Sequence, residues 1–145
     1  MKLAMVFPGQ GSQSVGMMHA YGDISAVNAI LAQSSAVLGT DMRKLIAEGP
    51  AEALNSTVNT QPAMVTAGHA AYRSGRDLGG PEPSIVAGHS LGEDTALVVG
   101  EAIAVAESLP LGRWRAGGVD GGDLRLLGWT GRNGLARGLR ACGPE

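Results

Sequence analysis

Residues 84–93, SIVAGHSLGE, constrain the fold more than any other part of this chain. A short apolar run ends at Gly88, and the pattern Gly-x-Ser-x-Gly follows at once. In such a pattern the glycines let the backbone turn sharply, and the serine sits at a strained position between a strand and a helix. The segment therefore predicts a strand, a tight turn and a helix, with the Ser90 hydroxyl exposed at the end of a sheet in an α/β fold.

The segments before this turn add one more strand and several helices. The run LAMVF at 3–7, ended by Pro8 and Gly9, is typical of a buried parallel strand. Apolar residues at helical spacing predict a helix from Ser25 that closes at Gly39.

Three further helical segments are predicted. One begins at Asp41 as its N-cap and ends near Gly49, and residues 51–57 form a further helical turn. A long helix follows, with Thr60 as a possible N-cap and Pro62 in its first turn. After the serine turn, the apolar residues of 92–116 again have helical spacing.

Composition excludes several classes of partner. A formal charge of −2 gives no attraction to nucleic acid or to anionic membranes. The first apolar run is too short for a signal peptide or a membrane span, and the single Cys142 forms no internal disulfide and no Cys-x-x-Cys metal site. We expect a cytoplasmic protein without a metal, a nucleic-acid partner or a membrane anchor.

Ser90 has the setting of a nucleophile. Its oxygen lies at the N-terminus of a helix, where the N–H of Leu91 can stabilise an oxyanion formed on an acyl carbonyl. The structural alternative is an N-cap serine that starts the helix, with Glu93 completing a capping box. His89 is a poor candidate for the base, because neighbouring side chains diverge at such a turn.

Three motifs occur together and in order: VFPGQGSQ at 6–13, NTQPAMVTAG at 59–68 and AGHSLGE at 87–93. In this combination residues 1–115 resemble malonyl-CoA:acyl carrier protein transacylases and the related acyltransferase domains of polyketide and fatty acid synthases. The resemblance implies a three-layer, α/β-hydrolase-like acyltransferase core. It also implies two substrates, malonyl-CoA and the phosphopantetheine arm of an acyl carrier protein, and no cofactor.

The resemblance implies a role for each matching residue. Ser90 accepts malonyl from coenzyme A and passes it to the carrier-protein thiol. The backbone N–H of Gln10 joins that of Leu91 in the oxyanion hole, and Gln61 lines the pocket. Arg115 matches the arginine that binds the free malonyl carboxylate, for which a guanidinium is well suited.

Each of these roles has a structural alternative. The GQGSQ segment could be an ordinary flexible loop, and Gln61 a polar residue of the first helical turn. Arg115 could be a solvated arginine at a helix end, with Arg113 a rival for the carboxylate. His19 and His69 are expected to be exposed or structural.

Two departures weaken the implied activity. The resemblance places the histidine base well after the serine, whereas all three histidines here precede Ser90. Asp94 stands where the family usually has an aromatic or small residue, and its carboxylate would disfavour both serine ionisation and a bound malonate.

The composition changes after residue 115. The Gly/Arg-rich segment 116–145 is interpreted as the result of a reading-frame change with early termination, or as a disordered tail. Residues 1–115 are then the N-terminal part of the domain, without its ferredoxin-like subdomain and the C-terminal part of its sheet. The main functional hypothesis is acyl carrier protein S-malonyltransferase; the alternatives are a non-catalytic remnant and a small serine esterase.

Overall fold

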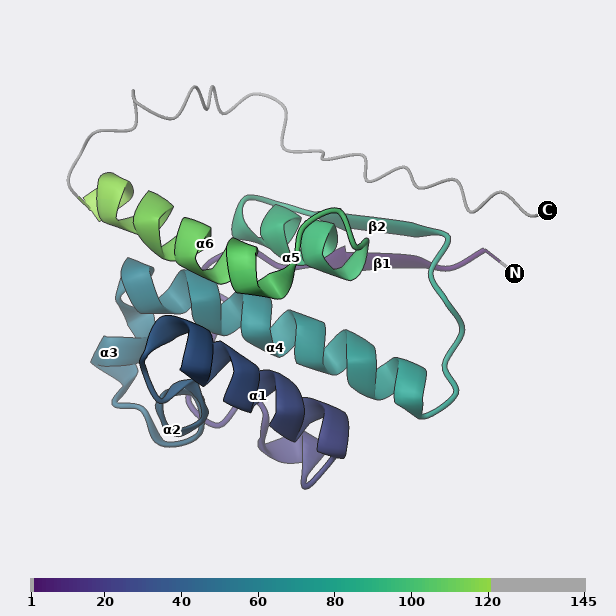
Figure 1. Cartoon of the computed structure of the whole chain (residues 1–145), viewed down its shortest axis with the longest axis horizontal. Coiled ribbons are helices and arrows are strands. Elements are labelled where there is room, and N and C mark those ends of the chain that lie inside the picture. Colours follow the sequence, from purple (N-terminus) through teal and green to yellow (C-terminus); the bar gives the residue numbers. More distant parts are fainter. Residues whose placement is uncertain (1, 121–145) are drawn as a thin grey trace.

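The computed structural model describes residues 2–120 (Figure 1). It is an α/β structure, as predicted, in which two parallel strands pack with helices. In chain order the elements are β1 (Ala4–Phe7), the 3₁₀ helix η1 (His19–Tyr21), α1 (Ser25–Leu38), α2 (Met42–Glu48), α3 (Ala51–Asn55), α4 (Thr57–Asp77), β2 (Ile85–Gly88), α5 (Leu91–Val99) and α6 (Val105–Asp120).

The two strands pair in a register that sets the position of the serine turn. Phe7 lies opposite Gly88, so both strands end at the same level. The loop after β1 and the turn after β2 therefore leave the sheet at one edge. The predicted order of strand, tight turn and helix around Ser90 is confirmed.

Only one face of this small sheet is covered by the described residues. Phe7 and Val86 are buried, whereas the side chain of Val6 is 71% exposed and that of Ile85 is 53% exposed. The prediction of a parallel strand at 3–7 is confirmed, but the expected burial is found on one face only. An apolar run is compatible with burial on both faces, but here helices pack on one face only.

Helix α4 is the central element (Figure 1). It contacts α1 and α3 on one side and α5 and α6 on the other. Residues 60–67 are all buried, which a helix achieves only when it is enclosed by neighbours on all sides. Its alanines pack in one apolar cluster with α1 and α2, while Met64 and Val65 pack in another with α5 and α6.

The helix ends before α4 follow local sequence signals. Gly39 adopts the left-handed conformation after α1, with φ of 60°. Asp41 caps α2, because its Oδ1 accepts a 2.9 Å hydrogen bond from the N–H of Lys44. Both predictions are confirmed, as is the short helix α3.

The predicted start of α4 is wrong. The helix begins at Thr57, and Thr60 lies within it. The Thr60 hydroxyl donates to the carbonyl oxygen of Leu54 at 2.6 Å, so it ties α4 to α3 and caps nothing. Pro62 consequently falls in the second helical turn, where its missing N–H leaves the carbonyl of Val58 without its helical donor.

The helical pattern of residues 92–116 belongs to two helices. Helix α5 ends at Val99, and the N–H of Gly100 closes it by donating to the carbonyl oxygen of Ala96 at 2.8 Å. Helix α6 then starts at Val105 and continues to Asp120, past the domain boundary expected at residue 115. Segment 121–145, which holds most of the predicted tail, lies outside the described residues.

None of the helices in residues 2–120 has the length and apolar character needed to cross a membrane.

Candidate active site

Steric contacts dictate the glycines of the serine turn. A Cβ on Gly88 would lie 1.9 Å from the carbonyl oxygen of Gly92. A Cβ on Gly92 would lie 2.3 Å from the carbonyl oxygen of Phe7 and 2.8 Å from that of Pro8. The first turn of α5 therefore presses directly on the end of β1, and no residue larger than glycine fits at either position.

Ser90 adopts a backbone conformation that is rare for a residue with a side chain. Its φ is 55° and its ψ is −120°, and its side chain is half-buried. A non-glycine residue held there stores about 1–3 kcal/mol of strain and persists only when its surroundings enforce it. Ser90 is the N-cap of α5, yet its hydroxyl accepts no capping hydrogen bond, so the capping-box alternative is wrong.

Two backbone amides near Ser90 are free to donate. The N–H groups of Gly92 and Glu93 bond to the carbonyl oxygens of His89 and Ser90, whereas that of Leu91 meets no acceptor within residues 2–120. The N–H of Gln10 likewise has no acceptor in this part of the chain.

The loop that carries Gln10 lies against the turn. A Cβ on Gly9 would lie 3.1 Å from the carbonyl oxygen of His89 and 3.9 Å from the Cβ of Ser90. Gly9 is thus a second point, after the contact of Gly92 with Phe7 and Pro8, at which the end of β1 and its loop lie against the serine turn. The Gln10 side chain turns to α4, where its Nε2 is 3.5 Å from Thr57 Oγ1.

Arg115 is only partly exposed, and its guanidinium is bonded. Its two terminal nitrogens donate to the two carboxylate oxygens of Asp94, one of them at 3.3 Å between Nη1 and Oδ1. Asp94 lies in the first turn of α5, four residues after Ser90. Burial raises the pKa of the Asp94 carboxyl, and the positive charge and hydrogen bonds of Arg115 partly offset that rise.

Arg113 is a structural residue. Its Nη1 donates to the carbonyl oxygen of Leu38 at 2.9 Å, and its Nη2 lies 3.2 Å from Thr40 Oγ1 and 3.4 Å from Asn59 Oδ1. These contacts join α6 to the end of α1 and the start of α4. Both arginines of α6 are thus bonded in this structure, Arg113 to neutral acceptors and Arg115 to a carboxylate.

Gln61 is a residue of α4 and is buried where α4 packs against α6. Only 7% of the residue is exposed, and a Cβ on Gly112 would lie 3.9 Å from its Oε1. That oxygen is buried without a hydrogen-bond partner among the described residues. An unsatisfied buried acceptor is costly, and Gln61 lies in the second turn of α4 and not in the first.

The histidines do not form a catalytic pair with Ser90. Across residues 2–120 the Ser90 hydroxyl makes no hydrogen bond to His19, His69 or His89. His19 and His89 are exposed, while His69 on α4 is half-buried. Burial, reinforced by the nearby charge of Arg73, lowers the pKa of His69 and so favours its neutral form.

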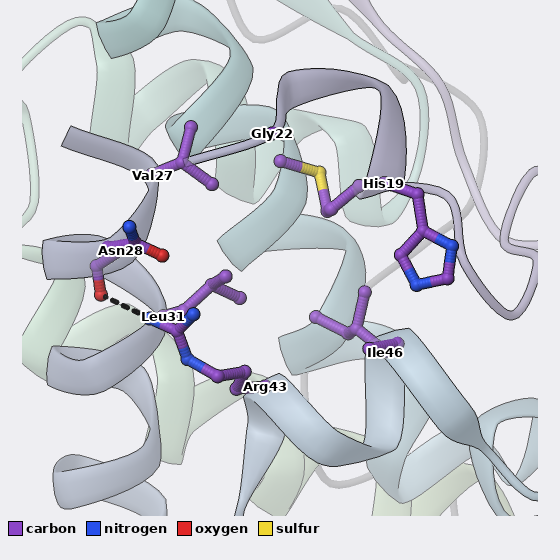
Figure 2. A pocket seen from close by; sticks show the side chains of 9 residues that line it. His19, Gly22, Val27, Asn28, Leu31, Arg43 and Ile46 are labelled. Carbon is purple, nitrogen blue, oxygen red and sulfur yellow. Dashed lines mark hydrogen bonds between the residues drawn. The ribbon is translucent and has the colours of Figure 1, made fainter. Parts of the chain in front are cut away.

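A cavity of about 220 Å³ lies elsewhere, among η1, α1 and α2 (Figure 2). Val27, Leu31 and Ile46 form its apolar wall, and Arg43 Nη2 donates to the carbonyl oxygen of Asn28 at 3.3 Å beside them. No residue of the serine turn lines it. The described residues also contain no group of three metal-ligating side chains.

Sequence reasoning missed two features of this site. Asp94 was noted as a carboxylate that disfavours activity, but it was not paired with Arg115. The opposite charges of these two residues, both in the predicted helical segment 92–116, could have indicated an ion pair. Sequence reasoning also did not single out Gly9, whose place in a Pro-Gly loop after a strand hinted at a close backbone approach.

Comparison with known proteins identifies the family. The acyl transferase domain family matches residues 4–120. The chain is 47% identical over 114 residues to the malonyl CoA-acyl carrier protein transacylase of Escherichia coli strain K12, covering 76% of this chain and 36% of that protein. The chain thus spans little more than a third of the length of this curated relative.

Solved structures agree. An acyl-carrier-protein S-malonyltransferase from Burkholderia pseudomallei 1710b superposes with a TM-score of 0.79 at 59% identity, over 81% of this chain and 38% of that one. A malonyl-transacylase solved with its type II PKS acyl-carrier protein gives a TM-score of 0.77 at 42% identity, over 81% and 38%. With the serine turn, these matches show that the chain belongs to the acyl transferase domain family.

Proposed function

We propose that this chain carries the nucleophile of an acyl carrier protein S-malonyltransferase, which moves malonyl from coenzyme A to a carrier-protein thiol. The observation that carries the proposal is the strained Ser90, followed by a Leu91 N–H that has no acceptor within residues 2–120 and approached by the Gly9 loop that carries Gln10. The choice of malonyl as the acyl group and of a carrier protein as the acceptor rests on the name of the Escherichia coli relative, which is 47% identical to this chain.

In the first step the Ser90 oxygen attacks the thioester carbonyl carbon. A carbon–oxygen bond forms, and the carbonyl oxygen becomes an oxyanion that the N–H groups of Leu91 and Gln10 stabilise. The carbon–sulfur bond then breaks, and coenzyme A leaves as a thiol. The proton that the thiol gains balances the proton that the serine hydroxyl loses. In the second step the phosphopantetheine sulfur attacks the carbonyl carbon of the seryl ester. A carbon–sulfur bond forms, the bond to the Ser90 oxygen breaks, and a proton equivalent to that of the thiol restores the hydroxyl. The acyl group moves between two thiols without a cofactor.

Gln61 and Arg115 complete the proposed substrate site. The unpartnered Oε1 of Gln61 is available to a ligand donor, and Arg115 reaches the serine end of α5 through its bond to Asp94. The malonyl carboxylate would bind the guanidinium, for which it competes with Asp94.

We also propose that residues 1–115 are the N-terminal part of a three-layer, α/β-hydrolase-like core, and that the change to a Gly/Arg-rich composition after residue 115 reflects a reading-frame change, while helix α6 and the family match continue to residue 120. The exposed faces of Val6 and Ile85 support this, because they are apolar surface that a further layer would cover. The part of the relatives outside the matched region would supply a ferredoxin-like subdomain, further strands and the base.

The second candidate is a non-catalytic remnant of the same enzyme. It is favoured by one observation, the position of all three histidines before Ser90. A serine alcohol needs a base to accept its proton, and neither His69 nor His89 bonds to it among the described residues.

Covalent loading separates the two candidates. The whole chain is incubated with malonyl-CoA, and the product is measured by intact-mass spectrometry. An S-malonyltransferase gains the mass of one malonyl group and loses it to added holo acyl carrier protein. The variant Ser90→Ala should gain nothing, whereas the control Ser84→Ala, at an exposed serine of the same segment, should load normally.

The outcomes are distinct. No mass gain by the unaltered chain supports the remnant. A gain that survives Ser90→Ala shows that another group is acylated and contradicts the proposal.

A further inference from the structure

The Asp94–Arg115 pair joins two helices beside the serine. Asp94 lies in the first turn of α5, and Arg115 extends from α6 to reach it. The side chain of Asp94 is 15% exposed and that of Arg115 is 28% exposed, so solvent screens the pair only partly.

The contact occupies the arginine in a specific way. A guanidinium recognises a carboxylate best through two parallel N–H···O bonds. Both terminal nitrogens of Arg115 already make this arrangement with the two oxygens of Asp94. Asp94 therefore holds the place that the carboxylate of a malonyl group would take.

A substrate carboxylate would have to displace Asp94 or share the arginine with it. Displacement leaves Asp94 largely buried and without its cation, which is strongly unfavourable. Sharing brings two negative charges close together in a partly screened site. An acyl group without a carboxylate, such as acetyl, meets neither penalty.

We propose that Asp94 is a specificity-determining residue that neutralises Arg115 and so lowers the preference of Ser90 for malonyl over acyl groups without a carboxylate. This rests on the proposed acyl transfer at Ser90. It goes beyond that proposal by assigning acyl discrimination to a residue outside the oxyanion hole.

Competition between two acyl donors tests the proposal. The whole chain, Asp94→Asn and Glu93→Gln are each loaded from an equimolar mixture of malonyl-CoA and acetyl-CoA, and the ratio of the two Ser90 esters is measured by mass spectrometry. Asp94→Asn should raise the malonyl-to-acetyl ratio about tenfold, because it frees the bidentate site. Glu93→Gln removes the same charge from the same helical turn but frees no arginine, so its ratio should stay unchanged.

A binding measurement decides the question even if no variant is acylated. The backbone N–H signals of residues 91–95 and 113–117, which every variant retains, are followed by NMR while sodium malonate or sodium acetate is added to the full chain. Malonate should bind Asp94→Asn about tenfold more tightly than the unaltered chain, and adding Arg115→Ala to that variant should abolish the gain.

Equal malonate affinity for the unaltered chain and Asp94→Asn would overturn the proposal, as would an unchanged ester ratio. Absence of acylation with the expected difference in malonate affinity would refute the transferase function alone and leave the role of Asp94 at Arg115 in place.

Discussion

The serine turn and the Asp94–Arg115 pair lie one helical turn apart and are held in different ways. At the turn, backbone meets backbone: Gly92 presses on the carbonyl groups of Phe7 and Pro8, and no side chain is needed. The pair consists of two side-chain heads from different helices, joined by hydrogen bonds between a guanidinium and a carboxylate. The position of the nucleophile is therefore rigid, while the charge beside it is open to substitution.

The largest effect is expected at the turn itself. Gly92→Ala places a Cβ against backbone that cannot move aside, so it should lower the free energy of unfolding by more than about 3 kcal/mol or prevent folding. Urea unfolding followed by circular dichroism measures it. The control is Gly75→Ala in α4, where a Cβ meets nothing within 4 Å, and where alanine should stabilise by about 0.5–1 kcal/mol. Equal stability of the two variants would show that the turn is not sterically fixed.

An intermediate effect on stability is expected at Arg113. This prediction distinguishes the structural role of Arg113 from the role of Arg115, the other arginine of α6. Arg113→Ala removes the hydrogen bonds to Leu38, Thr40 and Asn59, and should cost about 1–3 kcal/mol of unfolding free energy. Arg43→Ala, which removes one exposed 3.3 Å contact, should change stability by less than about 0.5 kcal/mol. The same urea titrations give both values, and a loss at Arg113 no greater than at Arg43 would contradict its structural role.

The smallest effect is a pH dependence from Asp94. Burial raises the pKa of its carboxyl in the folded chain above the unfolded value of about 3.9. The folded state then binds the proton more tightly, so this contribution to stability is full below the unfolded pKa and is lost as pH rises through the folded pKa. The unfolding free energy of the unaltered chain, minus that of Asp94→Asn, should fall over this window. A difference that rises with pH would mean that Arg115 outweighs burial.

Features written in short segments could be predicted from the sequence. The strand before Gly88, the cap at Asp41 and the left-handed Gly39 depend on a few consecutive residues, and each was predicted correctly. The motif around Ser90 also carries its own structural context, because it needs a strand before it and a helix after it.

Features that depend on distant contacts could not be predicted. Thr60 has the side chain of a cap, but the carbonyl of Leu54 on another helix takes its hydroxyl. Asp94 and Arg115 are 21 residues apart, and only the break at Gly100 lets α6 return to α5. The exposed face of β1 depends equally on which elements pack against it, which an apolar run does not encode.

The left-handed backbone of Ser90 has a consequence for judging variants of this chain. Such a conformation survives only while the packing of α5 against β1 enforces it. A change that loosens this packing lets residue 90 relax to ordinary dihedral angles, while the larger α1–α4 cluster stays intact. The orientation of the Ser90 hydroxyl would be lost well before the helices unfold. A variant with a native-like circular dichroism spectrum can therefore still have a misoriented hydroxyl.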